Sequence, residues 1–176
     1  FSSYPNIIRK NRNGVAVLDG SENIDQLKSL GNDIIEYFGL GCRNVSKLFL
    51  PKGYNLSLIF DGLLPHADII QNSKYANNFD YNKAVFLMSE FDFLENGFII
   101  LKEAKEYSAP IACIHYEYYD NLNLLKKEIN HNKNQIQCVI SKLPIPGAIS
   151  FGKAQKPELN EYADDIDTLL FLSQIN

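Results

Sequence analysis

Apolar residues in this chain fall into short compact runs separated by longer amphipathic stretches. The compact runs are typical of buried strands and occupy residues 14–18, 47–50, 98–101, 111–116 and 136–140. Apolar positions at helical spacing predict helices over residues 21–38, 55–70, 81–88 and 122–129. Because strands alternate with helices, the pattern indicates an α/β fold with an open, mostly parallel sheet and helices on both faces.

Local signals predict where these elements begin, bend and end. Ser21 is expected to cap the first helix at its N-terminus, and Gly39 is expected to end it. Pro65 is expected to bend or interrupt the helix at residues 55–70. Two polar stretches, residues 74–78 and 131–134, are expected to be surface loops.

Length and charge exclude several classes of protein. A chain of 176 residues is expected to form one domain, and 45% hydrophobic with 22% charged residues is typical of a globular protein. The net charge of −4 provides no basic stripe for a nucleic-acid partner. No apolar run reaches the roughly 18 residues that a membrane-spanning helix needs.

The three cysteines have no metal-type spacing, so we expect no metal site. An odd number of cysteines without a secretory segment favours a reducing, cytoplasmic location over a disulfide scaffold. Cys113 and Cys138 lie in apolar runs, where cysteine usually serves as a small core residue. Cys42 lies instead in a loop with Gly39 and Gly41, the setting of a covalent nucleophile.

The residues around Cys42 carry a resemblance to a known family. Residues 41–51, preceded by residues 11–18, resemble the acyl-CoA reductases related to the fatty-acid reductases of bacterial bioluminescence, within the aldehyde dehydrogenase superfamily. In that superfamily a strand and a helix lead into the loop that bears the nucleophilic cysteine, and a strand follows. The resemblance implies an aldehyde dehydrogenase-like catalytic domain in which Cys42 is the nucleophile.

Two further segments resemble the same family. Residues 106–110 are similar to the superfamily's Glu-x-x-Gly-Pro pattern, with Ala109 in place of glycine. The family's glutamate holds the nicotinamide ribose, so the resemblance implies that Glu106 contacts the cofactor. Residues 151–159 and 162–169 also resemble the acyl-CoA reductases, and the resemblance therefore extends over most of the chain.

A glutamate base distinguishes two reactions within the superfamily, the oxidation of an aldehyde and the reduction of a thioester. Hydrolytic aldehyde dehydrogenases carry a glutamate base in a Glu-Leu-Gly-Gly motif upstream of the cysteine. The corresponding residues 6–11 read Asn-Ile-Ile-Arg-Lys-Asn, and no carboxylate precedes Asp19. This fits reduction of a thioester better than oxidation of an aldehyde to an acid.

The resemblance implies a reaction in which Cys42 takes the acyl group of an acyl-CoA and NADPH reduces the acyl-cysteine to a fatty aldehyde. The sequence has no strand-flanked Gly-x-Gly-x-x-Gly. The superfamily binds its cofactor mainly on an N-terminal domain, so the resemblance implies that residues 1–176 are a single catalytic domain, a fragment that lacks this cofactor-binding domain and is expected to have little activity alone. Family members associate through their catalytic portions, which implies a homodimer.

Two other functions stay open at this stage. Cys42 could serve a hydrolase or acyltransferase with His66, His115 or His131 as its base, although His115 is expected to be a hydrogen-bonded structural residue. The chain could also be a non-catalytic assembly module with an unreactive Cys42. Arg43 and Lys47 could add positive potential near the thiol, but solvated side chains are the default expectation for both.

An aromatic cluster follows the cysteine-containing run at residues 111–116. Tyr116, Tyr118 and Tyr119 could line a channel for an acyl chain. Ordinary core and rim packing is the default expectation for such a cluster.

Overall fold

A computed structural model of the chain describes residues 3–8, 10–159, 161–162 and 166–175. Its centre is a six-stranded sheet with the strand order β3-β4-β5-β2-β1-β6. The strands are β1 (Asn13–Val17), β2 (Val45–Pro51), β3 (Leu94–Glu95), β4 (Ile100–Glu103), β5 (Cys113–Tyr119) and β6 (Ile136–Ile140). All neighbouring strands pair in parallel except β3 and β4, which are antiparallel. The predicted mostly parallel sheet is confirmed.

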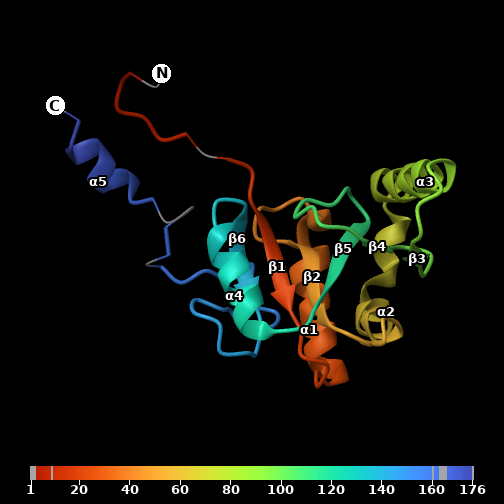
Figure 1. The fold of residues 1–176 in the computed structure, drawn as a ribbon. Helices are drawn as coiled ribbons and strands as arrows, with labels where there is room; N and C mark the ends of the chain where they lie inside the picture. Colours follow the sequence, from red (N-terminus) through yellow and green to blue (C-terminus); the bar gives the residue numbers. More distant parts are fainter. Residues whose placement is uncertain (1–2, 9, 160, 163–165, 176) are drawn as a thin grey trace.

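Helices cover both faces of this sheet (Figure 1). The helices of the described ranges are α1 (Ile24–Ile35), α2 (Ser57–Leu63), α3 (Ser73–Met88), α4 (Leu122–His131) and α5 (Thr168–Ser173), with two short 3-10 segments, η1 (Glu36–Gly39) and η2 (Leu64–Gln71). Helix α5 lies away from the sheet (Figure 1). The helices α1 and α2 pack on one face, and α4 packs on the opposite face. Within the described ranges, no helix combines the length and the apolar character required to cross a bilayer.

Alternation along the strands divides the core between the two faces. In β1, Ala16 packs into the cluster that α1 and α2 share, whereas Val15 and Val17 point to the other face. There they meet Leu125 and Ile129 of α4. Because successive residues of a strand point to opposite faces, one apolar run supplies both halves of the core.

The first helix begins and ends at other residues than the sequence predicts. Its N-cap is Asn23, which forms a capping box with Gln26, whereas Ser21 donates its hydroxyl hydrogen to Asp19. The helix ends at Ile35, and Gly39 lies in the turn that follows, with a φ of 73°. The prediction for Ser21 was wrong because Asn23 and Gln26 satisfy the backbone at the start of the helix, and Gly39 ends the 3-10 segment η1 and not α1 itself.

The next helical segment is interrupted at Pro65 as predicted, since α2 ends at Leu63 and the 3-10 segment η2 follows. The surface loop predicted at residues 74–78 is instead part of α3. The side chain of Asn72 accepts hydrogen bonds from the backbone N–H groups of Lys74 and Tyr75 and so starts that helix early. A single capping residue thus outweighed the polar composition of the segment.

A close approach between α1 and α2 depends on Gly62. A Cβ at this position would lie 2.5 Å from the Cβ of Leu27 and 2.9 Å from its backbone carbonyl carbon. We expect Gly62→Ala to lower the free energy of unfolding by about 2 kcal/mol, although alanine favours an isolated helix. Urea denaturation measures this change. Asp61→Ala, an exposed neighbour on α2, is the control, and equal stability of both variants would contradict the close packing.

Candidate active site

Cys42 lies on an exposed loop at the edge of the sheet where the parallel strands begin. This Cys42 loop, residues 36–44, joins α1 to β2. The backbone N–H of Gly14, in β1, donates to the carbonyl of Asn44 at 2.9 Å, and the thiol of Cys138, in β6, donates to the carbonyl of Arg43 at 3.6 Å. The loop is therefore attached to three neighbouring strands at their amino ends.

The backbone of the loop is unusual directly before Cys42. Tyr37, Phe38 and Gly39 have successive φ values of 54°, 60° and 73°. Non-glycine residues in this left-handed region cost on the order of 1 kcal/mol or more each and persist only where other contacts hold them. The reversal of the chain after α1 therefore needs a stabilising partner.

The buried side chain of Asn44 is that partner. Its amide nitrogen shares its hydrogens among the carbonyls of Asp33 at 3.1 Å, Ile34 at 3.1 Å and Glu36 at 2.8 Å. Its carbonyl oxygen accepts from the backbone N–H of Gly41 at 2.8 Å, and a Cβ at Gly41 would lie 2.7 Å from the same oxygen. Asn44 thus ends α1 and requires glycine next to Cys42.

Arg43 attaches the loop to the C-terminal segment, residues 151–159. Its Nε donates to the carbonyl of Ala154, and its Nη2 lies 3.1 Å from a carboxylate oxygen of Glu161. The expectation that Arg43 is a solvated cation was wrong, because the side chain is paired with a residue far along the chain. Its charge is shared with Glu161 and is not free to act on the thiol alone.

Asp33, in α1, holds the same C-terminal segment from the other side. Its carboxylate is 1% exposed and accepts the backbone N–H of Gly152 at 2.6 Å and of Ala154 at 2.9 Å. Burial raises the pKa of Asp33 from 3.8 to about 6, and the two hydrogen bonds only partly oppose this. The C-terminal segment is therefore joined to the Cys42 loop through Arg43 and to α1 through Asp33.

Glu106 lies on a second loop, residues 104–112, which precedes β5. Side chains of β2 and β5 hold three successive carbonyls of this Glu106 loop: Lys47 Nζ bonds to Lys105 at 2.7 Å, His115 Nδ1 to Glu106 at 3.0 Å and Ser46 Oγ to Tyr107 at 2.6 Å. Since Ser46 and Lys47 follow Asn44 closely in the chain, the first residues of β2 hold both loops.

Lys47 is fully buried, so the expectation of a solvated side chain was wrong for this residue as well. Its ammonium lies 2.6 Å from the carboxylate of Glu117 and about equally far from two ring centroids, 5.0 Å for Phe49 and 5.1 Å for Tyr107. These partners compensate the cost of removing the charge from water. Only the register between β2 and β5 brings Glu117 to Lys47, and the sequence alone does not contain that register.

The side chain of Glu106 is exposed. A hydrogen bond from its own backbone N–H is the main cause that lowers the pKa of this carboxyl group. Glu106 is therefore an ionised acceptor at neutral pH. Such a carboxylate can accept hydrogen bonds from the hydroxyls of a sugar.

The histidines do not form a base for Cys42. As predicted, His115 is buried and hydrogen-bonded, and desolvation by burial lowers its pKa. His66 lies 3.5 Å from the carbonyl of Lys28, and His131 is exposed at the end of α4. Within the part of the chain that the structure describes, no hydrogen bond joins any histidine to Cys42.

The other two cysteines are buried, as predicted. Desolvation raises the pKa of both Cys113 and Cys138 to about 12, so neither thiol ionises at neutral pH. Cys42 is the exposed member of the three.

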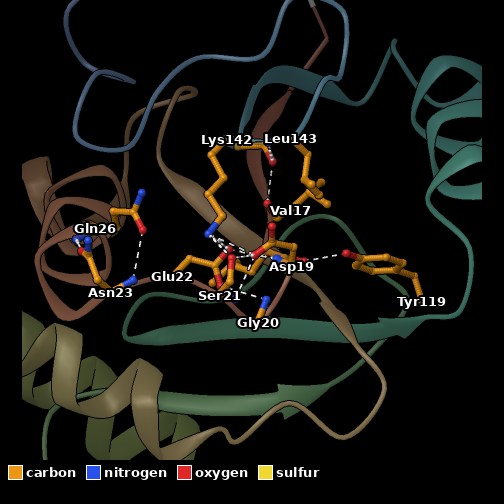
Figure 2. Close-up of polar contacts among 12 residues, drawn as sticks. Val17, Asp19, Gly20, Ser21, Glu22, Asn23, Gln26, Tyr119, Lys142 and Leu143 are labelled. Carbon is orange, nitrogen blue, oxygen red and sulfur yellow. Dashed lines mark hydrogen bonds and ion pairs between the residues drawn. The ribbon is translucent and has the colours of Figure 1, made fainter.

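The opposite, carboxyl edge of the sheet carries a polar network (Figure 2). Lys142 lies 3.1 Å from the carboxylate of Asp19 and 3.7 Å from that of Glu22. Partial burial tends to raise the pKa of Asp19, but hydrogen bonds from Ser21 and Lys142 lower it to about 2. The acids of this network have partners within it, which indicates that it joins the ends of β1 and β6 and is not a site for a ligand.

The predicted aromatic cluster packs as expected around the last residues of β5. The rings of Tyr116 and Tyr118 meet edge to face with centroids 5.5 Å apart, and the Tyr119 hydroxyl donates to the carbonyl of Leu18 at 2.7 Å. Both Tyr116 and Tyr118 pack against the core on the α1 side. The cluster lies away from the amino edge that carries Cys42.

No known protein-family profile matches the chain, and no curated protein sequence matches it. Solved structures of similar fold include an indole-3-acetaldehyde dehydrogenase complexed with NAD+, with a TM-score of 0.50 and 8% identity over 80% of this chain and 39% of that one. Another is a mutant of Thermus thermophilus 1-pyrroline-5-carboxylate dehydrogenase, with a TM-score of 0.49 and 9% identity over 80% of this chain and 37% of that one. A third is the Mycobacterium tuberculosis Delta-pyrroline-5-carboxylate dehydrogenase bound with NAD, with a TM-score of 0.49 and 15% identity over 91% of this chain and 41% of that one. The chain thus spans about two fifths of the length of these structures. The likeness at a TM-score of 0.50 shows that the fold is one found in aldehyde dehydrogenases.

The hydrogen bonds of Asn44 can be tested by an isosteric change. Asn44→Asp replaces the amide donor with a carboxylate that faces three carbonyls, so we expect the free energy of unfolding to fall by about 3 kcal/mol. Chemical denaturation gives this value. The same change at the exposed Asn130 is the control, and a loss at Asn44 no larger than the loss at Asn130 would rule out the proposed role.

The raised pKa of Asp33 predicts a pH dependence of stability. Between about pH 6 and the ordinary pKa of 3.8, the folded protein binds more protons at Asp33 than the unfolded chain does. The contribution of Asp33 to stability therefore rises as the pH falls through this window, by on the order of 3 kcal/mol. Urea denaturation at several pH values measures this contribution as the difference between wild type and Asp33→Asn, which should grow towards low pH. Asp68→Asn, at an exposed position, should show no such trend.

Proposed function

We propose that this chain is the catalytic portion of an acyl-CoA reductase that forms an acyl-cysteine at Cys42 and reduces it to a fatty aldehyde with NADPH. One observation carries the proposal: an exposed cysteine lies on a loop fixed by Asn44, while the next residues of β2 hold the loop of Glu106. An aldehyde dehydrogenase-like fold supports this assignment of the two residues.

The first step belongs to Cys42. Its thiolate attacks the carbonyl carbon of the acyl-CoA thioester, a carbon–sulfur bond to Cys42 forms, and the bond to the CoA sulfur breaks. CoA leaves as a thiolate that takes up a proton. The backbone N–H of Cys42 makes no hydrogen bond to another described residue, so it is free to donate to the oxyanion that develops.

The second step needs a hydride donor, and Glu106 fits a contact with such a cofactor. NADPH, when bound, supplies the hydride that reduces the thioester carbon, after which Cys42 is released as the aldehyde leaves. The ionised and exposed Glu106 would accept hydrogen bonds from ribose hydroxyls. The contacts of Lys47, His115 and Ser46 fix the backbone from which that carboxylate extends.

A Cys–His hydrolase receives less support. Such an enzyme needs a histidine in hydrogen-bond reach of the thiol, whereas the buried His115 is committed to the Glu106 carbonyl.

Mass spectrometry after brief incubation with a long-chain acyl-CoA tests the nucleophile. We expect one acyl group on wild type, mapped to Cys42 and released by hydroxylamine, and at least a roughly tenfold lower yield for Cys42→Ala, because the buried thiols stay protonated. Cys113→Ala is the matched control and should keep the adduct. Acylation spread over all three cysteines, or equal yield from Cys42→Ala, would refute the proposed nucleophile.

A further inference from the structure

Cys42 and Arg43 are the two central residues of a tight turn at the end of the Cys42 loop. The backbone N–H of Asn44 donates to the carbonyl of Gly41 at 2.9 Å and closes this turn. The peptide bond between Gly41 and Cys42 is trans, so the N–H of Cys42 points opposite to that carbonyl and away from the interior of the turn. The orientation of the turn therefore decides where this free donor lies relative to a bound thioester.

Asn44 fixes the turn only at its base. Its backbone and its side-chain oxygen both bond to Gly41, at 2.9 and 2.8 Å. Cys42 itself forms no hydrogen bond with any other residue in the described ranges of the chain. The outer half of the turn is therefore held through Arg43, whose carbonyl accepts the weak thiol donor of Cys138 and whose guanidinium makes stronger contacts.

The partners of this guanidinium lie on two of its sides. Nε donates to the carbonyl of Ala154, whereas Nη2 lies 3.1 Å from the carboxylate of Glu161. Ala154 is fully buried, and its own N–H donates to Asp33 of α1 at 2.9 Å, so its carbonyl is a fixed point. The planar guanidinium presents its donors in a rigid arrangement that a lysine ammonium cannot reproduce.

The C-terminal segment also lies against the other neighbour of Cys42. A Cβ at Gly41 would be 3.6 Å from Nε2 of Gln155, which is ordinary van der Waals contact. Both neighbours of Cys42 therefore contact this segment, but only Arg43 is joined to it by hydrogen bonds from its side chain.

We propose that Arg43 is a positioning residue for the nucleophile, an inference that rests on the function proposed above. By bonding to Ala154 and Glu161, its side chain holds the turn in the orientation in which the N–H of Cys42 donates to the oxyanion. This oxyanion forms when the thiolate adds to the thioester carbonyl, and it collapses as the CoA thiolate leaves. Arg43 therefore acts on the acylation step through the backbone of Cys42 and not on the exposure of its thiol.

The test compares two reactions of Cys42 in the full chain, acylation at a saturating concentration of palmitoyl-CoA and alkylation by iodoacetamide. Both require an accessible thiolate, but alkylation displaces iodide at a saturated carbon and forms no oxyanion. We expect Arg43→Lys, which keeps the charge, to slow acylation about tenfold and alkylation by less than about twofold. Glu161→Gln leaves the bond to Ala154 in place and should slow acylation only about threefold. Arg12→Lys makes the same change outside the Cys42 loop, and as the control it should alter neither rate.

The outcomes separate the two proposals. A proportional fall of both rates in Arg43→Lys, or no fall in acylation, overturns the positioning role, although Cys42 is still the acyl acceptor. If palmitoyl-CoA does not acylate Cys42 in the wild type while iodoacetamide alkylates it, the proposed function fails and this inference fails with it. The side chain of Glu161 is 41% exposed, so Glu161→Gln is expected to fold normally and provides the same comparison should Arg43→Lys be unstable.

Discussion

The start of β2 is the constraint on which both halves of the candidate site depend. Asn44 holds the end of α1 and the turn before Cys42, and Ser46 and Lys47 bond to carbonyls of the Glu106 loop. These residues lie in or next to a central strand paired on both sides, so they have little freedom to move. The distance between the nucleophile and the expected cofactor contact is therefore set by one short piece of backbone.

The hydrophobic pattern predicted the architecture well because burial on two faces leaves a strong signal in a parallel sheet. The strand at Ile136–Ile140 has the predicted bounds, and the interruption at Pro65 is where it was expected. The two-residue strand β3 and the helix α5 were not predicted. Both elements are too short for a hydrophobic period to show.

The sequence identified candidate site residues only where their neighbours in the chain indicate a role. Cys42 could be singled out from its glycine neighbours, and the two other cysteines from their apolar ones. Arg43 and Lys47 could not be understood in this way, since their partners Glu161 and Glu117 are distant in sequence. The role of Asn44 was missed for another reason. Asparagine is a common residue in and beside loops, and only the folded structure shows that three backbone carbonyls converge on its side-chain amide.

The contacts of Asp33 have a consequence for how the protein is made. They join α1 to Gly152 and Ala154, which lie 119 and 121 residues further along the chain. The ribosome therefore releases Cys42 long before it releases the residues that pack against the Cys42 loop. During synthesis the thiol is exposed on an incompletely supported loop, and the candidate site acquires its final geometry only when residues 151–159 fold back onto α1.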